Sequence, residues 1–84
     1  MLTIWVTRPV RSVADLGAAI NVAAYGPEAA AERPVARNLD ALADVLREIS
    51  PRYSKVVVAD WGLTGTSASK MLNVFEDAGV QLVR

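Results

Sequence analysis

The amino-acid sequence predicts an α/β fold in which helices pack on a small parallel sheet. Short β-branched segments alternate with longer segments of helical periodicity along the chain. Every connection between predicted strands contains a helix of about ten residues or more, a length typical of the crossovers that join parallel strands. The chain has 84 residues, which is enough for one hydrophobic core. We therefore expect residues 1–84 to form a single domain with three strands and three to four packed helices.

The chain begins with a predicted strand and a predicted helix. Leu2–Val6 alternates and is rich in β-branched and aromatic residues, which favours a strand, and Pro9 ends it. Ser12–Asp15 has the pattern of a capping box, and apolar residues then recur at helical spacing to about Ala24. Tyr25–Pro27 ends this helix. The sequence thus predicts a first strand that leads through a short loop into a capped helix.

The middle of the chain is predicted as a loop followed by an amphipathic helix. Glu28–Arg37 is rich in alanine and broken by Pro34, so we expect a connecting loop with at most one short helical turn. Asn38 is a favourable N-cap, and Leu39–Ile49 has an apolar stripe at helical spacing. Proline at position 51 ends this helix, because the residue before a proline is disfavoured in the α conformation.

The last third of the chain is predicted as strand, helix and strand. Lys55–Ala59 is a continuous β-branched run, typical of a strand buried on both faces of a parallel sheet. After a polar stretch at Gly62–Ser67, a helix presents apolar residues inward and ends at Gly79, where a left-handed cap is favourable. Val80–Val83 is the last predicted strand. The inner positions of this helix are Ala68, Met71, Leu72, Phe75 and Ala78.

Composition excludes several classes of function. The chain has no cysteine and no histidine, so it cannot use a disulfide, a thiolate nucleophile or an imidazole base. Nine basic and nine acidic residues balance, which argues against nucleic-acid binding through a general basic field. The apolar start is too short for a signal peptide or a membrane span. We expect a cytoplasmic protein that has no membrane association, cofactor, bound metal or catalytic residue, and that is a monomer when free.

Two acids stand out on the helix Leu39–Ile49. Asp40 and Asp44 are four residues apart and point away from the apolar stripe. Like charges at this spacing destabilise an isolated helix by about 0.2–0.5 kcal/mol, and the helix dipole offsets this only near the first turn. The spacing therefore indicates a cationic partner, although Asp44 could also be a solvated acid that pairs with Arg47.

The motif Asn-Leu-Asp-Ala-Leu-x-Asp-x-Leu at residues 38–46 resembles the barstar family, intracellular inhibitors of bacterial guanyl-specific ribonucleases. Three other segments, in the same order, are similar to the family's first helix start, the end of its second strand and its last helix. They are Arg11–Leu16, Val58–Trp61 and Met71–Ala78. The resemblance implies a barstar-like fold with three parallel strands in the order 1-2-3.

The resemblance also implies a function and a binding site. In that family the second helix and the preceding loop block the ribonuclease active site with carboxylates that mimic RNA phosphates. Asp40 and Asp44 match the family's helix acids, and Asp77 matches an acid of its last helix that reaches the enzyme's rim. The expected partner is an extracellular-type ribonuclease or another basic protein, and the expected contact residues are Asn38, Asp40, Ala43, Asp44, Arg37 and Asp77.

The sequence departs from the family pattern at several of these positions. Pro34–Arg37 replaces a Tyr-Gly that usually precedes Asn38, Ala43 replaces a bulky aromatic residue, and Arg37 adds a positive charge beside the acids. The net charge is zero, whereas known inhibitors are acidic, so electrostatic steering would be weaker. An alternative is therefore a module of the same fold that binds a partner other than a ribonuclease.

Other functional motifs are weaker. Ser67-x-x-Lys70 has the spacing of a serine nucleophile and its lysine, but the companion motifs of such enzymes are missing. Asp60 follows a strand, as in receiver domains, yet Thr7 and Arg8 occupy the place of the magnesium-binding acids. A third possibility is a small magnesium-dependent enzyme that uses Asp60 or Asp40. No base, nucleophile or phosphate loop accompanies these acids in the sequence, which argues against it. The aromatic residues, among them Trp5 and Trp61, are expected in the core or covering the sheet rather than stacking on bases.

Overall fold

The computed structural model describes residues 2–84, which form three strands and four helices. In chain order the elements are β1 (Leu2–Val6), α1 (Val13–Tyr25), α2 (Pro27–Glu32), α3 (Leu39–Ile49), β2 (Tyr53–Val58), α4 (Gly65–Ala78) and β3 (Gln81–Val83). The expected α/β class and the number of packed helices are confirmed. Relative to the sequence-based boundaries, β2 begins two residues earlier and ends one residue earlier, and β3 begins one residue later.

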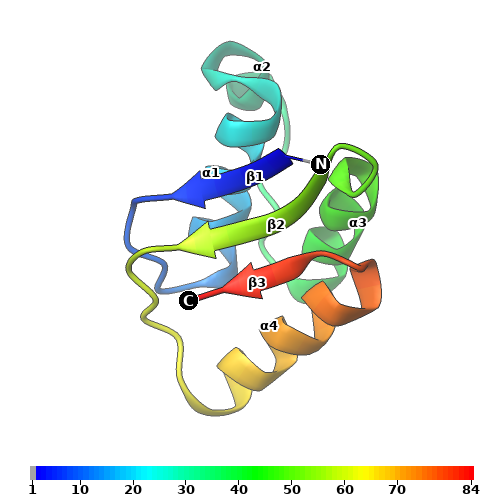
Figure 1. The fold of residues 1–84 in the computed structure, drawn as a ribbon. Coiled ribbons are helices and arrows are strands. Elements are labelled where there is room, and N and C mark those ends of the chain that lie inside the picture. Colours follow the sequence, from blue (N-terminus) through cyan, green and yellow to red (C-terminus); the bar gives the residue numbers. More distant parts are fainter. Residues whose placement is uncertain (1) are drawn as a thin grey trace.

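The strands form one parallel sheet in the order β1-β2-β3 (Figure 1). Ile4 is paired with Val56, and Val56 with Leu82. An isolated bridge between Val10 and Trp61 continues the contact of the first two chain segments beyond their strands. The prediction of parallel pairing for both crossovers is therefore confirmed.

The helices lie against one face of the sheet (Figure 1), so the expectation that β2 is buried on both faces was wrong. Ile4, Val6, Val56 and Val58 point to the helices and are buried, whereas Val57 is half-buried and Trp5 is exposed. Side chains alternate between the two faces of a strand, so Val57 and Trp5 belong to the uncovered face. The β-branched run reflects the central position of β2 rather than burial of both faces, and Trp5 departs from the expected core or covering role.

The predicted loop at Glu28–Arg37 contains a helix, α2 (Pro27–Glu32), which is a correction to the sequence-based interpretation. Pro27 occupies the first helical position, where its missing N–H costs nothing and its fixed φ is helical. The alanines and glutamates that follow are strong helix formers. The proline that ends α1 therefore also starts α2, and the true loop is limited to Arg33–Asn38.

Local capping accounts for three helix boundaries. Ser12 Oγ accepts from the Asp15 N–H at 3.1 Å, and Asn38 Oδ1 accepts from the Ala41 N–H at 2.8 Å. Gly79 ends α4 in the left-handed conformation with φ of 76°. All three caps were predicted from the sequence and are confirmed.

The hydrophobic core lies between the sheet and helices α1, α3 and α4, while α2 packs on α1. Its largest members are Phe75, Met71, Ile4, Leu16, Ile20, Leu42, Leu46 and Ile49, all at most 1% exposed. Among residues 2–84, no helix has the length and apolar character needed to cross a membrane. The apolar residues Leu42, Leu46 and Ile49 of α3 are buried in this core. Their burial determines which residues of α3 face outward.

Candidate partner-binding site

The outer face of α3 carries the two acids that the sequence singled out. Leu42, Leu46 and Ile49 are completely buried, whereas Asp40 and Asp44 are exposed. Helical geometry places residues four apart on one face, so the two carboxylates are neighbours on a surface that the core holds rigid. The sequence-based assignment of the two acids to the outer face is confirmed.

The other expected contact residues of this segment lie beside the acids. Arg37 and Asn38 are exposed, although the Asn38 side chain is committed to capping α3. Ala43 is half-buried next to Asp44. The segment therefore presents a partly charged surface without a large aromatic side chain.

Asp44 is already engaged by a cation of its own helix. Arg47 Nη1 donates to Asp44 Oδ1 at 3.1 Å, and the side chains of both residues are more than half exposed. A surface pair of this kind contributes about 0–1 kcal/mol and opens easily. Asp44 can therefore exchange Arg47 for a partner's cation, whereas Asp40 has no ion-pair partner among residues 2–84.

Asp77 lies near the end of α4, which packs against α3. Its side chain is exposed. No hydrogen bond or ion pair within residues 2–84 joins it to Asp40 or Asp44. Asp77 is thus available on the surface, and its membership of the site still rests on the resemblance.

A surface groove of about 230 Å³ borders Asp44 and was not apparent from the sequence. It lies between the loop Arg33–Asn38 and α3, and its lining residues are Arg33, Pro34, Val35, Ala36, Ala41, Asp44 and Val45. Most of these side chains are apolar, and a carboxylate stands at the rim. Such a groove can accept the stem of a long basic side chain while the carboxylate binds its charged end.

The loop Arg33–Asn38 is fixed to α1 by close packing. Ala36 is 3% exposed, and a Cβ on Gly17 would lie 2.7 Å from the Ala36 carbonyl oxygen. Asn21, itself 2% exposed, donates from Nδ2 to the Pro34 carbonyl at 3.3 Å. Only glycine at position 17 permits this close approach. Gly17 was not singled out from the sequence, although it determines where the loop can pack.

An ionic and aromatic cluster holds the start of the same loop. The Arg33 guanidinium lies 3.8 Å from the centre of the Tyr25 ring, and its Nη2 donates to both Glu48 carboxylate oxygens at 3.1 Å. Cation–π stacking and a charge-assisted hydrogen bond thus act on one side chain. Arg33 thereby ties the end of α1 to Glu48 of α3, which lies one turn after Asp44 on the same outward face.

The cluster shifts the pKa values of Glu48 and Tyr25. The buried Tyr25 hydroxyl lies beside Glu48 but makes no hydrogen bond of good geometry with it. The Tyr25 hydroxyl and then the Arg33 charge lower the pKa of Glu48, and burial followed by the polar contact with the Glu48 carboxylate raises the pKa of Tyr25. Because its pKa is lowered, Glu48 contributes to folding stability above its unfolded-state pKa, and this contribution is lost as the pH falls through the folded-state pKa. Because its pKa is raised, the contribution of Tyr25 to stability is lost as the pH rises through its folded-state pKa.

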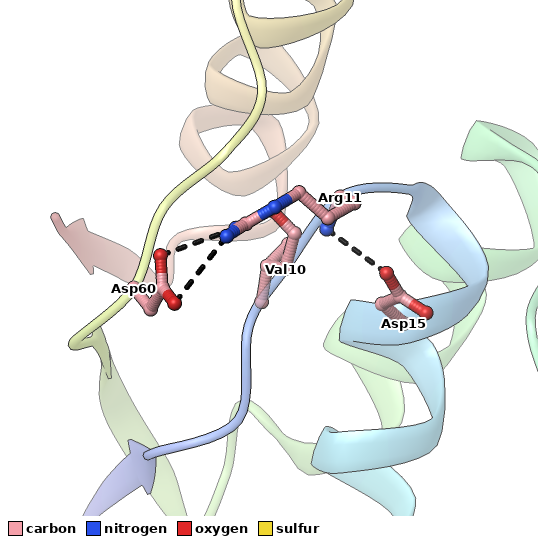
Figure 2. Close-up of polar contacts among 4 residues, drawn as sticks. All are labelled: Val10, Arg11, Asp15 and Asp60. Atoms are coloured by element: carbon pink, nitrogen blue, oxygen red, sulfur yellow. Dashed lines mark hydrogen bonds and ion pairs between the residues drawn. The ribbon is translucent and has the colours of Figure 1, made fainter.

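A third ion pair lies where β1 and β2 end (Figure 2). Arg11 donates from Nη1 and Nη2 to the two Asp60 oxygens at 3.1 and 3.4 Å, and its backbone N–H donates to Asp15 at 2.9 Å. A Cβ on Gly62 would meet the Arg11 side chain at 2.4 Å, so this glycine makes room for it. Asp60, one of the acids considered for magnesium, is thus bound by an arginine that links two loops.

No family model matches the chain, and comparison with curated proteins and with solved structures also gave no match. Within residues 2–84, no three aspartate or glutamate side chains lie close enough together to hold a metal ion. The surface best suited to recognition consists of the exposed acids of α3, the groove beside Asp44 and the loop Arg33–Asn38. We call it the α3 surface.

Proposed function

We propose that the protein is a barstar-like inhibitor of a guanyl-specific-type bacterial ribonuclease and that the α3 surface covers the enzyme's active site. A ribonuclease of this type must stabilise a phosphate with arginine or lysine, and carboxylates on a rigid helix can pair with these groups at little entropic cost. The observation that supports the proposal most is the exposure of Asp40 and Asp44 side by side on a helix whose opposite face is fully buried. The resemblance of the sequence to the barstar family adds to it.

The experiment compares inhibition of RNA cleavage by the parent chain and by a double variant, Asp40→Asn with Asp44→Asn. Asparagine keeps the size and hydrogen-bonding capacity but removes both charges. We expect the parent to inhibit at least one of several secreted bacterial ribonucleases, and the double variant to lose at least about 100-fold in affinity, since each charged pair contributes about 1.5–3 kcal/mol. Glu76→Gln removes one exposed acid of α4 outside the α3 surface; it controls for the loss of an acid elsewhere and should inhibit like the parent.

Arg47→Gln sharpens the test, because it removes the cation that competes for Asp44. Under the phosphate-mimic mechanism this variant should inhibit as well as the parent or better. Equal inhibition by the parent and the double variant would reject the mechanism.

A second candidate function is a barstar-fold interaction module whose partner is not a ribonuclease. The pairing of Asp44 with Arg47, together with exposed Arg37 and zero net charge, favours it, because the surface is less acidic than a mimic of RNA requires. If the parent inhibits none of the ribonucleases while the chain remains folded, this second function is supported.

A further inference from the structure

No helix of residues 2–84 covers the face of the sheet that points away from the core (Figure 1). Because Ile4 and Val56 point to the helices, the alternate residues of their strands belong to the other face. The strand register arranges these residues in two rows across the sheet. One row is Thr3, Lys55 and Gln81, and the other is Trp5, Val57 and Val83. We call these six residues the open sheet face.

The charges of the chain are divided unevenly between the strands and the helices. The strand segments, residues 2–12, 50–61 and 80–84, carry five basic residues and one acid. The helical segments, residues 13–49 and 62–79, carry four basic residues and eight acids. The single acid of the strand segments, Asp60, is paired with Arg11. The zero net charge therefore results from basic strand segments and acidic helical segments.

The helical acids act only weakly at the open sheet face. The Debye length at physiological ionic strength is about 8 Å, whereas the smallest dimension of the molecule is 22 Å. None of the six open-face residues is acidic, and Lys55 forms no ion pair within residues 2–84. A neutral chain can thus present a local basic surface, which the overall balance of charges did not reveal.

Trp5 is 70% exposed and lies between two cations. Lys55 is its diagonal neighbour on the open sheet face, where a strand spacing of about 4.8 Å and a rise of about 3.3 Å per residue place the two Cα atoms about 8 Å apart. On the other side, Trp5 and the exposed Arg8 line one groove of about 250 Å³ between β1 and α1. Arg8, like Lys55, has no ion-pair partner within residues 2–84.

We propose that the open sheet face binds single-stranded nucleic acid, with a base stacked on the Trp5 indole and the flanking phosphates bound by Lys55 and Arg8. Proteins that bind single strands without sequence preference combine an aromatic stacking surface with cations that follow the backbone. The bases of a duplex are stacked on each other, so an exposed indole favours a single strand. Trp5 therefore has a role that the sequence did not predict.

Other anionic partners match this face less well. A membrane surface requires several large apolar side chains, but Trp5 is the only one of the six residues that is large and apolar, and Val57 and Val83 are half-buried. An acidic peptide would pair with Lys55 and Arg8 but would leave Trp5 without a stacking partner. The proposal uses no residue of the α3 surface, so it stands independently of the proposed function.

The experiment measures the fluorescence anisotropy of a labelled oligothymidine of about twelve nucleotides, a length within the usual range of single-strand binding sites. The parent chain should bind it, and the affinity should fall as the salt concentration rises. Trp5→Leu keeps an exposed apolar side chain but removes the aromatic ring, so the dissociation constant should rise at least about 5-fold. Trp5→Phe keeps a ring and should bind more tightly than Trp5→Leu.

A pair of lysine variants tests the electrostatic part. Lys55→Gln should weaken binding and lower the slope of log affinity against log salt by about 0.7. Lys70→Gln is the matched control, because it makes the same change at an exposed lysine of α4 and should bind like the parent. Circular dichroism establishes that each variant is folded.

Several outcomes would overturn the proposal. They are a parent that does not bind the oligothymidine at submillimolar concentration and low salt, a Trp5→Leu variant that binds as tightly as the parent, and a duplex of the same length that binds as tightly as the single strand. Equal weakening by Lys55→Gln and Lys70→Gln would show that total charge governs binding, which also contradicts a defined site. Tighter binding to vesicles of phosphatidylcholine and phosphatidylserine would assign the face to a membrane instead.

Discussion

The inner and outer faces of the segment Arg33–Ile49 are built in opposite ways. On the inner face Ala36 touches Gly17, Asn21 holds the Pro34 carbonyl, and the α3 leucines fill the core. On the outer face Asp40 and Asp44 are exposed, and the ion pair with Arg47 is weak. Packing therefore fixes the position of the segment, and Asp40 and Asp44 are not needed to hold it in place. Substitutions should then affect stability and recognition separately.

The largest loss is expected for Gly17→Ala on the inner face. Alanine favours a helix by up to about 1 kcal/mol over glycine, but its Cβ would lie too close to the Ala36 backbone to be accommodated without movement. We expect a net loss of about 1–3 kcal/mol in the free energy of unfolding, measured by chemical denaturation. A gain in stability would show that the loop yields easily and that the inner face is not tightly packed.

A smaller loss is expected for Asn38→Ala, at the boundary between the two faces. The variant removes the side-chain bond to the Ala41 N–H, and the loss of an N-cap costs about 1 kcal/mol. Thr64→Ala is the matched control, because Thr64 is the N-cap of α4 but makes no side-chain capping bond. Thermal unfolding should separate the two variants, and equal melting temperatures would show that the Asn38 cap contributes nothing.

The smallest effect is expected for Asp44→Ala on the outer face. The variant loses a weak pair with Arg47 and relieves repulsion by Asp40, so the free energy of unfolding should stay within about 0.5 kcal/mol of the parent. Urea denaturation of the two proteins measures the difference. A loss above about 2 kcal/mol would mean that Asp44 supports the fold and would remove the contrast between the faces.

Much of this architecture could be predicted from local signals. Ser12 and Asn38 indicated helix starts because their side chains can cap a backbone N–H, and Gly79 indicated a helix end because glycine adopts the left-handed conformation easily. All three residues have these roles in the structure. The β-branched run of β2 identified the central strand. The exposure of Asp40 and Asp44 followed from helical periodicity alone, which is a strong constraint once one face is apolar.

The remaining features depend on contacts between distant residues. α2 was missed because Pro27 can end one helix and begin another, and sequence alone does not separate these roles. The open sheet face was missed because a β-branched residue such as Val57 is as favourable on a half-buried surface as in a core. The groove beside Asp44 depends on where Ala36 meets Gly17, a contact that no local pattern encodes.

The all-parallel sheet has a consequence for the order of folding. Ile4 is paired with Val56, about twice as far along the chain as Val56 is from Leu82. Doubling a closed loop adds only about 0.6 kcal/mol of entropy cost, so loop closure favours the β2–β3 ladder slightly over the β1–β2 ladder. During synthesis, however, β1 emerges first and has no neighbour until β2 is complete. The nascent first half of the chain can therefore form helices but no sheet, and β1 spends that interval as an unpaired apolar strand.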